Sequence, residues 1–162
     1  MKKIFFIIIC IAVLGCKDSQ SSKVSTILNN MENLVDLRGE SLDVSNLKGK
    51  KVLVNYWATW CAPCIHEMPD LLEAQEILSK ENYVFLLVSD ESKEQIQEFK
   101  DKFKYDFTFL RSPESLSNIG IYAMPTTFIF KIGSLQMVHS SFTFPCTNKQ
   151  FWNLPVTPKL EV

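Results

Sequence analysis

The chain has 162 residues, of which 46% are hydrophobic and 22% are charged. These values suit one soluble globular domain with modest extensions, and they exclude a disordered chain, a collagen-like repeat and a polytopic membrane protein. The 17 basic and 18 acidic residues give a net charge of −1, so we expect no binding to nucleic acid, which requires an excess of positive charge.

The first residues have the pattern of an export signal. Two lysines precede an uninterrupted apolar run from Ile4 to Leu14, which is too short to span a bilayer comfortably and is typical of a secretory signal peptide. The run ends in Val-Leu-Gly-Cys at 13–16, which resembles the lipobox of bacterial lipoproteins. That resemblance predicts a lipoprotein signal peptide over 1–15 and lipidation of Cys16. The alternative is an ordinary signal peptide followed by a chance cysteine.

This interpretation places the mature protein in the bacterial cell envelope, held by lipid to the inner or outer membrane and facing the periplasm. Outside the cytosol a cysteine pair can stay oxidised. Residues 16–29 are predicted to be a flexible tether, because most of this segment is polar and rich in serine. One domain is expected over 30–145 and an irregular tail over 146–162, where two prolines oppose a helix.

The predicted elements begin with a β-hairpin whose strands, 34–37 and 41–43, flank a turn. An apolar strand at 52–57 without polar alternation indicates burial on both faces. Apolar residues at helical spacing predict a helix from Pro63 to Lys80, with Pro69 inside it. The remaining elements are a strand at 83–88, a surface helix at 92–104, a strand at 107–110, a short helix at 114–119 and strands at 126–131 and 135–139.

Strands that alternate with helices and then close in a hairpin predict an α/β fold. We expect a central mixed β-sheet with helices on both faces and a β-hairpin at the N-terminal end.

The motif Trp-Cys-Ala-Pro-Cys at 60–64 follows the buried strand and opens a helix. Unpaired backbone N–H groups and the helix dipole favour an anion at this position. They lower the pKa of a thiol there, which predicts Cys61 as the attacking thiolate. Cys64 lies one turn further into the helix and is expected to resolve the mixed disulfide. A zinc site would need two more ligands at a suitable spacing, and we predict no metal.

A second motif, Ala-Met-Pro-Thr at 123–126, comes about sixty residues later, directly before a strand. Taken with the cysteine motif, the segments 54–64, 67–69 and 124–128 resemble the TlpA/ResA-like thiol–disulfide oxidoreductases of the thioredoxin superfamily. The resemblance covers about 34–139. It implies a thioredoxin-like fold, a redox-active Cys61–Cys64 disulfide and a cis peptide bond before Pro125.

The resemblance also implies roles for individual side chains. Thioredoxin has a buried aspartate on its central strand where this chain has Asn55, which cannot exchange a proton, so we expect Asn55 to serve stability. Glu67 is the candidate proton acceptor for Cys64, the alternative being a partly solvated first-turn glutamate, and His66 is expected to lie at the surface. The residues expected to contact substrate are Trp60, Met124, Pro125 and Thr126.

We therefore expect a thiol–disulfide oxidoreductase, in the reducing direction, that acts on cysteine-containing exported proteins without a cofactor. A membrane or periplasmic electron donor is implied, and the protein is expected to be a monomer. Two alternatives stay open: a peroxiredoxin-like peroxidase, which would need a threonine where Ala58 stands, and a redox-inert binding module, which would need neither cysteine of the pair. Cys146 is either a third redox thiol or an inert cysteine.

Overall fold

The computed structural model describes residues 26–132 and 136–140. The predicted signal peptide over 1–15, the lipidation site Cys16, Cys146 and the tail over 146–162 lie outside these residues, as do most of the tether and the end of the predicted domain. Within the described ranges, no helix combines the length and the apolar character needed to cross a membrane.

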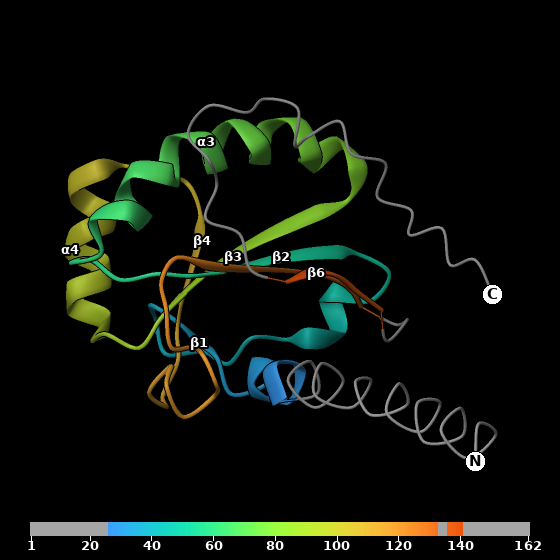
Figure 1. Ribbon diagram of the computed structural model, residues 1–162, viewed down its shortest axis with the longest axis horizontal. Helices are drawn as coiled ribbons and strands as arrows, with labels where there is room; N and C mark the ends of the chain where they lie inside the picture. The colour runs from blue at the N-terminus through green and yellow to red at the C-terminus, as the bar shows by residue number, and fades with distance from the viewer. Residues whose placement is uncertain (1–25, 133–135, 141–162) are drawn as a thin grey trace, which may run out of the picture.

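A six-stranded mixed sheet forms the centre of the domain (Figure 1). Its strands are β1 (Val35–Asp36), β2 (Lys51–Tyr56), β3 (Tyr83–Ser89), β4 (Thr108–Arg111), β5 (Thr126–Lys131) and β6 (Gln136–Ser140). The spatial order is β1-β4-β3-β2-β5-β6. β2, β3 and β4 run parallel, whereas β1, β5 and β6 each run antiparallel to their neighbours. The central mixed sheet expected from the sequence is confirmed.

The two long helices cover the same face of this sheet. α3 (Ala62–Leu78) connects β2 to β3, and α4 (Lys93–Phe103) connects β3 to β4. Both connections step in the same direction across parallel strands, and because such crossovers are right-handed they place both helices on one side. Met68 and Leu71 of α3 and Phe99 of α4 belong to one buried cluster with Leu53 and Phe85 from the strands.

Shorter segments cover the opposite face. They are the helix at residues 26–31, the 3-10 helix η1 (Val44–Leu47) and the turns at 112–121. Helices therefore lie on both faces as expected, although those on this second face are short. Ile27 and Met31 are buried at 2% and 1% exposure, so the tether predicted over 16–29 is corrected at its end: residues 26–29 belong to a packed helix.

Two predicted elements differ in the structure. The N-terminal hairpin is shorter than expected: it has one antiparallel bridge, between Val35 and Ser41, and backbone hydrogen bonds from Asp36 to Glu40 and from Leu42 to Leu34, while the other edge of β1 pairs with β4. The helix predicted over 114–119 is instead a series of turns. Asn118 and Gly120 donate their N–H groups to carbonyls three residues earlier, so the four-residue spacing of an α-helix does not form.

A short 3-10 helix, η2 (Ser79–Glu81), follows α3 and leads into β3. The other long elements agree with the sequence prediction within one or two residues. Ser92 caps α4 in a capping box with Gln95, which explains why this helix is visible in the sequence alone. β2 is buried along nearly its whole length, as its uninterrupted apolar pattern indicates.

Candidate active site

The two cysteines of the motif meet at the beginning of α3. Cys61 is the N-cap of the helix, and Cys64 lies in its first turn. Their sulfur atoms form a disulfide at 2.02 Å, and the backbone N–H of Cys64 also points at Cys61 Sγ, 3.3 Å away. Pro63 fits the first turn because a residue there needs no N–H partner within the helix. The helix N-terminus thus supplies a hydrogen-bond donor, the N–H of Cys64, to the sulfur of Cys61.

The two sulfur-bearing residues differ in access to solvent. Cys61 is 5% exposed and Cys64 is 1% exposed. Trp60, immediately before Cys61, is 71% exposed, and Ala62 and Pro63 are exposed as well. Cys61 is thus slightly more accessible than Cys64, and the order of attack expected from the sequence stays a prediction.

Sheet register brings the second motif to the cysteines. β2 leads directly into the cysteine motif, and β5, which begins at Thr126, runs antiparallel beside it with Tyr56 opposite Thr126. The end of β2 and the start of β5 therefore lie side by side. The peptide bond between Met124 and Pro125 is cis, as expected. Thr126 closes the turn through its hydroxyl, which donates to the carbonyl of Ala123 at 2.7 Å.

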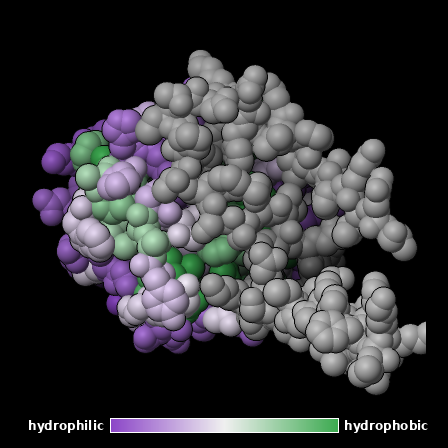
Figure 2. Space-filling view, viewed as in Figure 1, coloured by the Kyte–Doolittle hydropathy of each residue, from purple (hydrophilic) through white to green (hydrophobic). Residues whose placement is uncertain are grey.

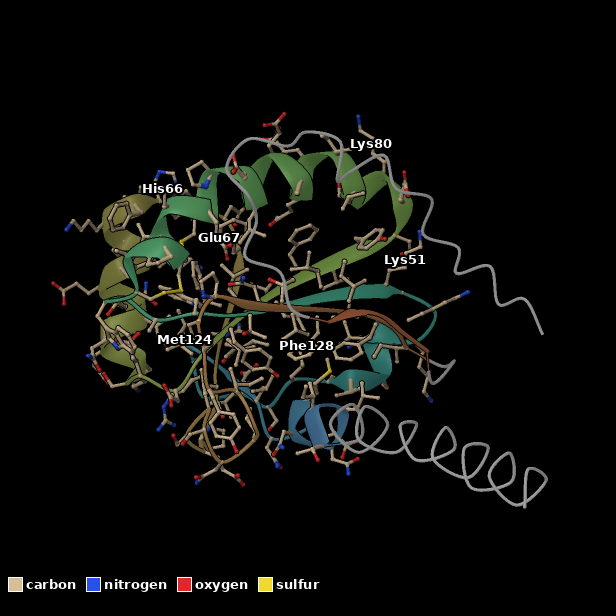
Figure 3. The ribbon with its side chains drawn as sticks, viewed as in Figure 1. Lys51, His66, Glu67, Lys80, Met124 and Phe128 are labelled. Atoms are coloured by element: carbon tan, nitrogen blue, oxygen red, sulfur yellow. A yellow bond between two sulfur atoms is a disulfide. The ribbon has the colours of Figure 1, made fainter. Side chains whose placement is uncertain are left out.

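A buried polar network lies beneath the cysteines. Glu67 is 2% exposed and Asn55 is 1% exposed, and Figure 3 shows Glu67 on the side of α3 that faces the sheet. Asn55 Nδ2 donates to Glu67 Oε1 at 2.8 Å and to Thr127 Oγ1 at 3.0 Å. The alternative of a partly solvated Glu67 is therefore wrong, whereas His66 is exposed on the outer side of the helix as expected.

Sequence reasoning missed Thr127 and gave Asn55 no contact with Glu67. The available signal was a polar residue, Asn55 or Thr127, next to the apolar run of each buried strand, β2 and β5. A buried polar side chain needs a hydrogen-bond partner, and the antiparallel register places Asn55 opposite Thr127.

Sequence reasoning also missed the residue that anchors the loop before Cys61. Glu91, just after β3, accepts hydrogen bonds from the backbone N–H of Thr59 at 2.7 Å and from the Thr59 hydroxyl at 2.6 Å. The hydroxyl of Ser89 donates to the same carboxylate at 3.1 Å. One side chain therefore joins the loop that carries Trp60 to the end of the neighbouring strand.

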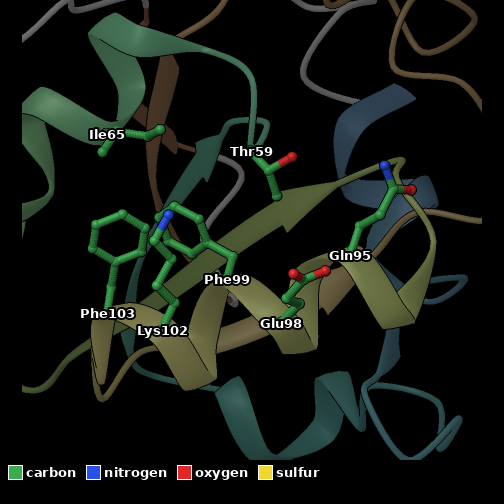
Figure 4. Close-up of a pocket in the computed structure, with 7 residues that line it drawn as sticks. All are labelled: Thr59, Ile65, Gln95, Glu98, Phe99, Lys102 and Phe103. Carbon is green, nitrogen blue, oxygen red and sulfur yellow. The ribbon is translucent and has the colours of Figure 1, made fainter.

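A pocket of about 340 Å³ opens beside this loop, between α3 and α4 (Figure 4). Thr59 and Ile65 form one side, and Phe99 and Phe103 of α4 line the other together with polar residues of the same helix. In the space-filling view, apolar groups reach the surface at the end of the molecule where α4 lies (Figure 2).

The described residues contain no group of three or more His, Cys, Asp or Glu side chains able to hold a metal ion. Burial raises the pKa of Tyr56 at the end of β2, so its phenol stays protonated in the cluster on the other face of the sheet. The chemistry available to this arrangement is that of the cysteine pair and the buried carboxyl group.

Comparison with known proteins places these features in a family. A family model described as Redoxin matches residues 20–131, more than half of the chain. Thioredoxin-like protein YneN of Bacillus subtilis is 35% identical over 116 residues, which cover 66% of each chain. Thiol-disulfide oxidoreductase ResA of Geobacillus kaustophilus is 33% identical over 109 residues, covering 65% of this chain and 63% of the relative. The chain thus spans slightly less than two thirds of the length of these relatives.

Among solved structures, the pneumococcal exposed lipoprotein thioredoxin of Streptococcus pneumoniae is similar with a TM-score of 0.56 and 26% identity. The match covers 67% of this chain and 85% of that protein.

Proposed function

We propose a function for this chain from one premise: it belongs to the Redoxin family, and within the thioredoxin superfamily it is TlpA/ResA-like. The proposed function is that of a thiol–disulfide oxidoreductase, and the favoured direction is reduction of substrate disulfides. The observation that carries the proposal is the Cys61–Cys64 pair, closed into a disulfide at the beginning of α3. The relative most informative about activity is named a thiol-disulfide oxidoreductase.

In the proposed reaction the Cys61 thiolate attacks one sulfur of a substrate disulfide. A mixed disulfide forms with that sulfur, and the other substrate sulfur leaves as a thiolate. Cys64 then gives its proton to the Glu67 carboxylate and attacks Cys61 Sγ. The Cys61–Cys64 disulfide forms, and the second substrate sulfur leaves as a thiolate. The substrate gains two electrons and the cysteine pair loses two, so a dithiol electron donor must restore the pair.

Glu67 suits the part of proton acceptor by its place on the helix. It lies three residues after Cys64, and residues at this spacing share one face of a helix. Both side chains are buried, so bulk water has poor access to the proton that Cys64 must lose. A carboxyl group one turn away supplies an acceptor for that proton.

The proposed substrate contacts surround Cys61. Trp60 offers a large exposed ring beside it, and the turn formed by Met124, Pro125 and Thr126 lies beside the end of β2. An extended substrate segment placed between these two groups would have its sulfur over Cys61. We propose cysteine-containing exported proteins as the substrates.

The proposed location is the cell envelope, with Cys16 lipidated and the domain facing away from the cytosol as a monomer. A similar solved protein is described as an exposed lipoprotein thioredoxin, which supports an extracytoplasmic location. The test is fractionation of cells that express the full chain. Cys16→Ser is expected to release the protein from the membrane fraction or to leave it unprocessed, and a fully aqueous wild-type protein would contradict lipidation.

An assay of insulin disulfide reduction, run beside an assay of hydrogen peroxide consumption, tests the activity. The reduced protein is expected to reduce insulin with dithiothreitol as electron donor, and the double variant Cys61→Ser/Cys64→Ser is expected to lose that activity. Peroxide consumption without insulin reduction would favour a peroxiredoxin-like peroxidase. Activity in neither assay would favour a redox-inert binding module.

A further inference from the structure

We propose that Asn55 is a positioning residue that keeps Glu67 ionised, and thereby able to accept the proton of Cys64. This inference rests on the proposed function, because it concerns the proton that leaves Cys64 when the mixed disulfide is resolved. Asn55 itself touches neither the substrate nor a reacting sulfur. It acts through Glu67, with Thr127 as the second partner of its amide group.

The direction of the hydrogen bonds is the first argument. Both hydrogens of Asn55 Nδ2 are donated, one to Glu67 Oε1 at 2.8 Å and one to Thr127 Oγ1 at 3.0 Å. Asn55 Oδ1 is buried and accepts no hydrogen bond from the described residues. The amide is therefore oriented by its donor side. An N–H donated to a carboxylate oxygen stabilises the ionised form of that group.

Burial is the second argument. Glu67 is 2% exposed, and removal of water from a carboxyl group favours its neutral form. A neutral carboxylic acid is a poor acceptor for the proton of a thiol. The hydrogen bond from Asn55 opposes this effect of burial, so the two act on the same equilibrium with opposite sign.

The sheet beneath Glu67 supplies a neutral donor, the amide of Asn55. On α3 itself, Cys64 lies one turn before Glu67 and Asp70, which is half-buried, lies one turn after. Of the neighbouring strands β2, β3 and β5, none has a lysine or arginine at the end where Asn55 lies. β3 contains no charged residue, and the only charged residues of β2 and β5, Lys51 and Lys131, pair with each other at the opposite end of those strands. Among the described residues, the stabilising partner that the sheet supplies to Glu67 is a neutral donor.

The network also spans the proposed site. Asn55 lies on β2 before the cysteine motif, Glu67 on the helix after it, and Thr127 on β5 two residues after the cis proline. Loss of the Asn55 amide would therefore remove a contact shared by the three elements that carry the reaction.

The test is a stopped-flow reaction of the reduced protein with 5,5′-dithiobis(2-nitrobenzoate), measured across a range of pH. The first thionitrobenzoate is released when Cys61 attacks the reagent. The second is released when Cys64 attacks Cys61 Sγ and loses its proton. The second phase is expected to accelerate with rising pH as Glu67 ionises. In Asn55→Ala the ionised form of Glu67 loses a hydrogen bond, so the pH at which the second phase accelerates is expected to rise by about one unit.

Two further variants separate positioning from mere structure. Val54→Ala removes buried volume from the adjacent residue of the same strand; it is expected to lower stability without a shift of the pH profile. Thr127→Val keeps the shape of the side chain but removes the hydroxyl that accepts the second hydrogen bond of Asn55. The pH profile of the second phase is expected to shift upward by less than in Asn55→Ala.

The decisive measurement is the double variant Asn55→Ala/Glu67→Gln. If Asn55 acts through Glu67, its substitution adds no shift once the carboxyl group is gone. An equal shift in the presence and absence of Glu67, or no shift in Asn55→Ala, would overturn the inference. A wild-type protein that releases no second thionitrobenzoate would instead contradict the proposed function itself, so the two failures are distinguishable.

Discussion

The Glu91 carboxylate provides a direct test of how the loop before Cys61 is held. It accepts two hydrogen bonds from Thr59 and one from Ser89. A hydrogen bond to a charged group contributes about 1.5–3 kcal/mol to stability when fully buried. Glu91 is only half-buried, and water can replace part of what Glu91→Ala removes. We therefore expect a loss of about 2 kcal/mol in the free energy of unfolding, well below the sum of three buried bonds.

Glu91→Gln separates geometry from charge. Its amide can still accept from the Thr59 N–H and donate to the Thr59 hydroxyl, but both bonds are then neutral. Because charge-assisted hydrogen bonds are roughly twice as strong as neutral ones, we expect about half the loss of Glu91→Ala. The loop would keep its position in this variant, so attack by Cys61 should slow less than in Glu91→Ala.

Urea unfolding and the first phase of the thionitrobenzoate reaction measure the two effects. The unfolding midpoint of Glu91→Ala is expected to fall by about 1 M urea, given typical slopes for a domain of this size. Glu94→Ala is the matched control, since that side chain is exposed and its ion pair within the described part of the chain is with the neighbouring Lys93, at 3.9 Å. If both alanine variants lose the same stability and react at the same rate, Glu91 does not hold the loop.

Three further predictions concern the cysteines, the core and the first turn. Cys64→Ser is expected to trap a covalent mixed disulfide that gel electrophoresis detects without reductant, whereas Cys61→Ser should trap none; equal trapping would contradict the order of attack. Trp57 is fully buried against Phe99 and Phe109, so Trp57→Ala should cost about 3–5 kcal/mol in urea unfolding. Trp57→Phe should cost clearly less stability than Trp57→Ala, because phenylalanine keeps an aromatic ring and lacks the indole N–H, which is buried without a partner among the described residues. Equal losses of stability in the two variants would refute this reasoning. The hydrogen bond from the Glu40 backbone lowers the pKa of Asp36. The stability that ionised Asp36 contributes is therefore present above the unfolded pKa of about 3.9 and is lost as pH falls through the lower folded pKa. Asp36→Asn should make Tm depend less on pH in that acid range, and an unchanged dependence of Tm on pH would count against this reasoning.

Local features of this chain were readable from the sequence. The cysteine motif at the junction of a buried strand and a helix needs only neighbouring residues, and Cys61 is indeed the N-cap of α3. Ser92 and Gln95 form their capping box three residues apart. The apolar run of β2 indicated a strand buried on both faces, which the structure confirms. The resemblance to a family added the cis bond before Pro125, which the residues near it did not require.

Where the sequence prediction failed locally, tertiary contacts decided. Residues 26–29 follow a polar, serine-rich stretch that suggests a tether, yet Ile27 is buried against the sheet. The segment 114–119 has helical spacing but forms turns, which Asp90 joins to the end of β3 by accepting the backbone N–H of Leu116 at 2.9 Å. Burial of Ile27 against another element thus overrides the conformation suggested by the residues before it.

The polar groups beneath the cysteines were beyond the reach of sequence patterns for the same reason. Asn55 meets Glu67 across 12 residues and Thr127 across 72, and Glu91 meets Thr59 across 32. Such contacts depend on which strands pair and in which register, and a shift of one residue would turn Thr127 to the other face of the sheet. The sequence by itself determined the thiol pair and the helix that carries it. Only the assembled sheet decided which buried groups surround that pair, because hydrogen bonds between distant residues exist only once the strands that carry them have paired.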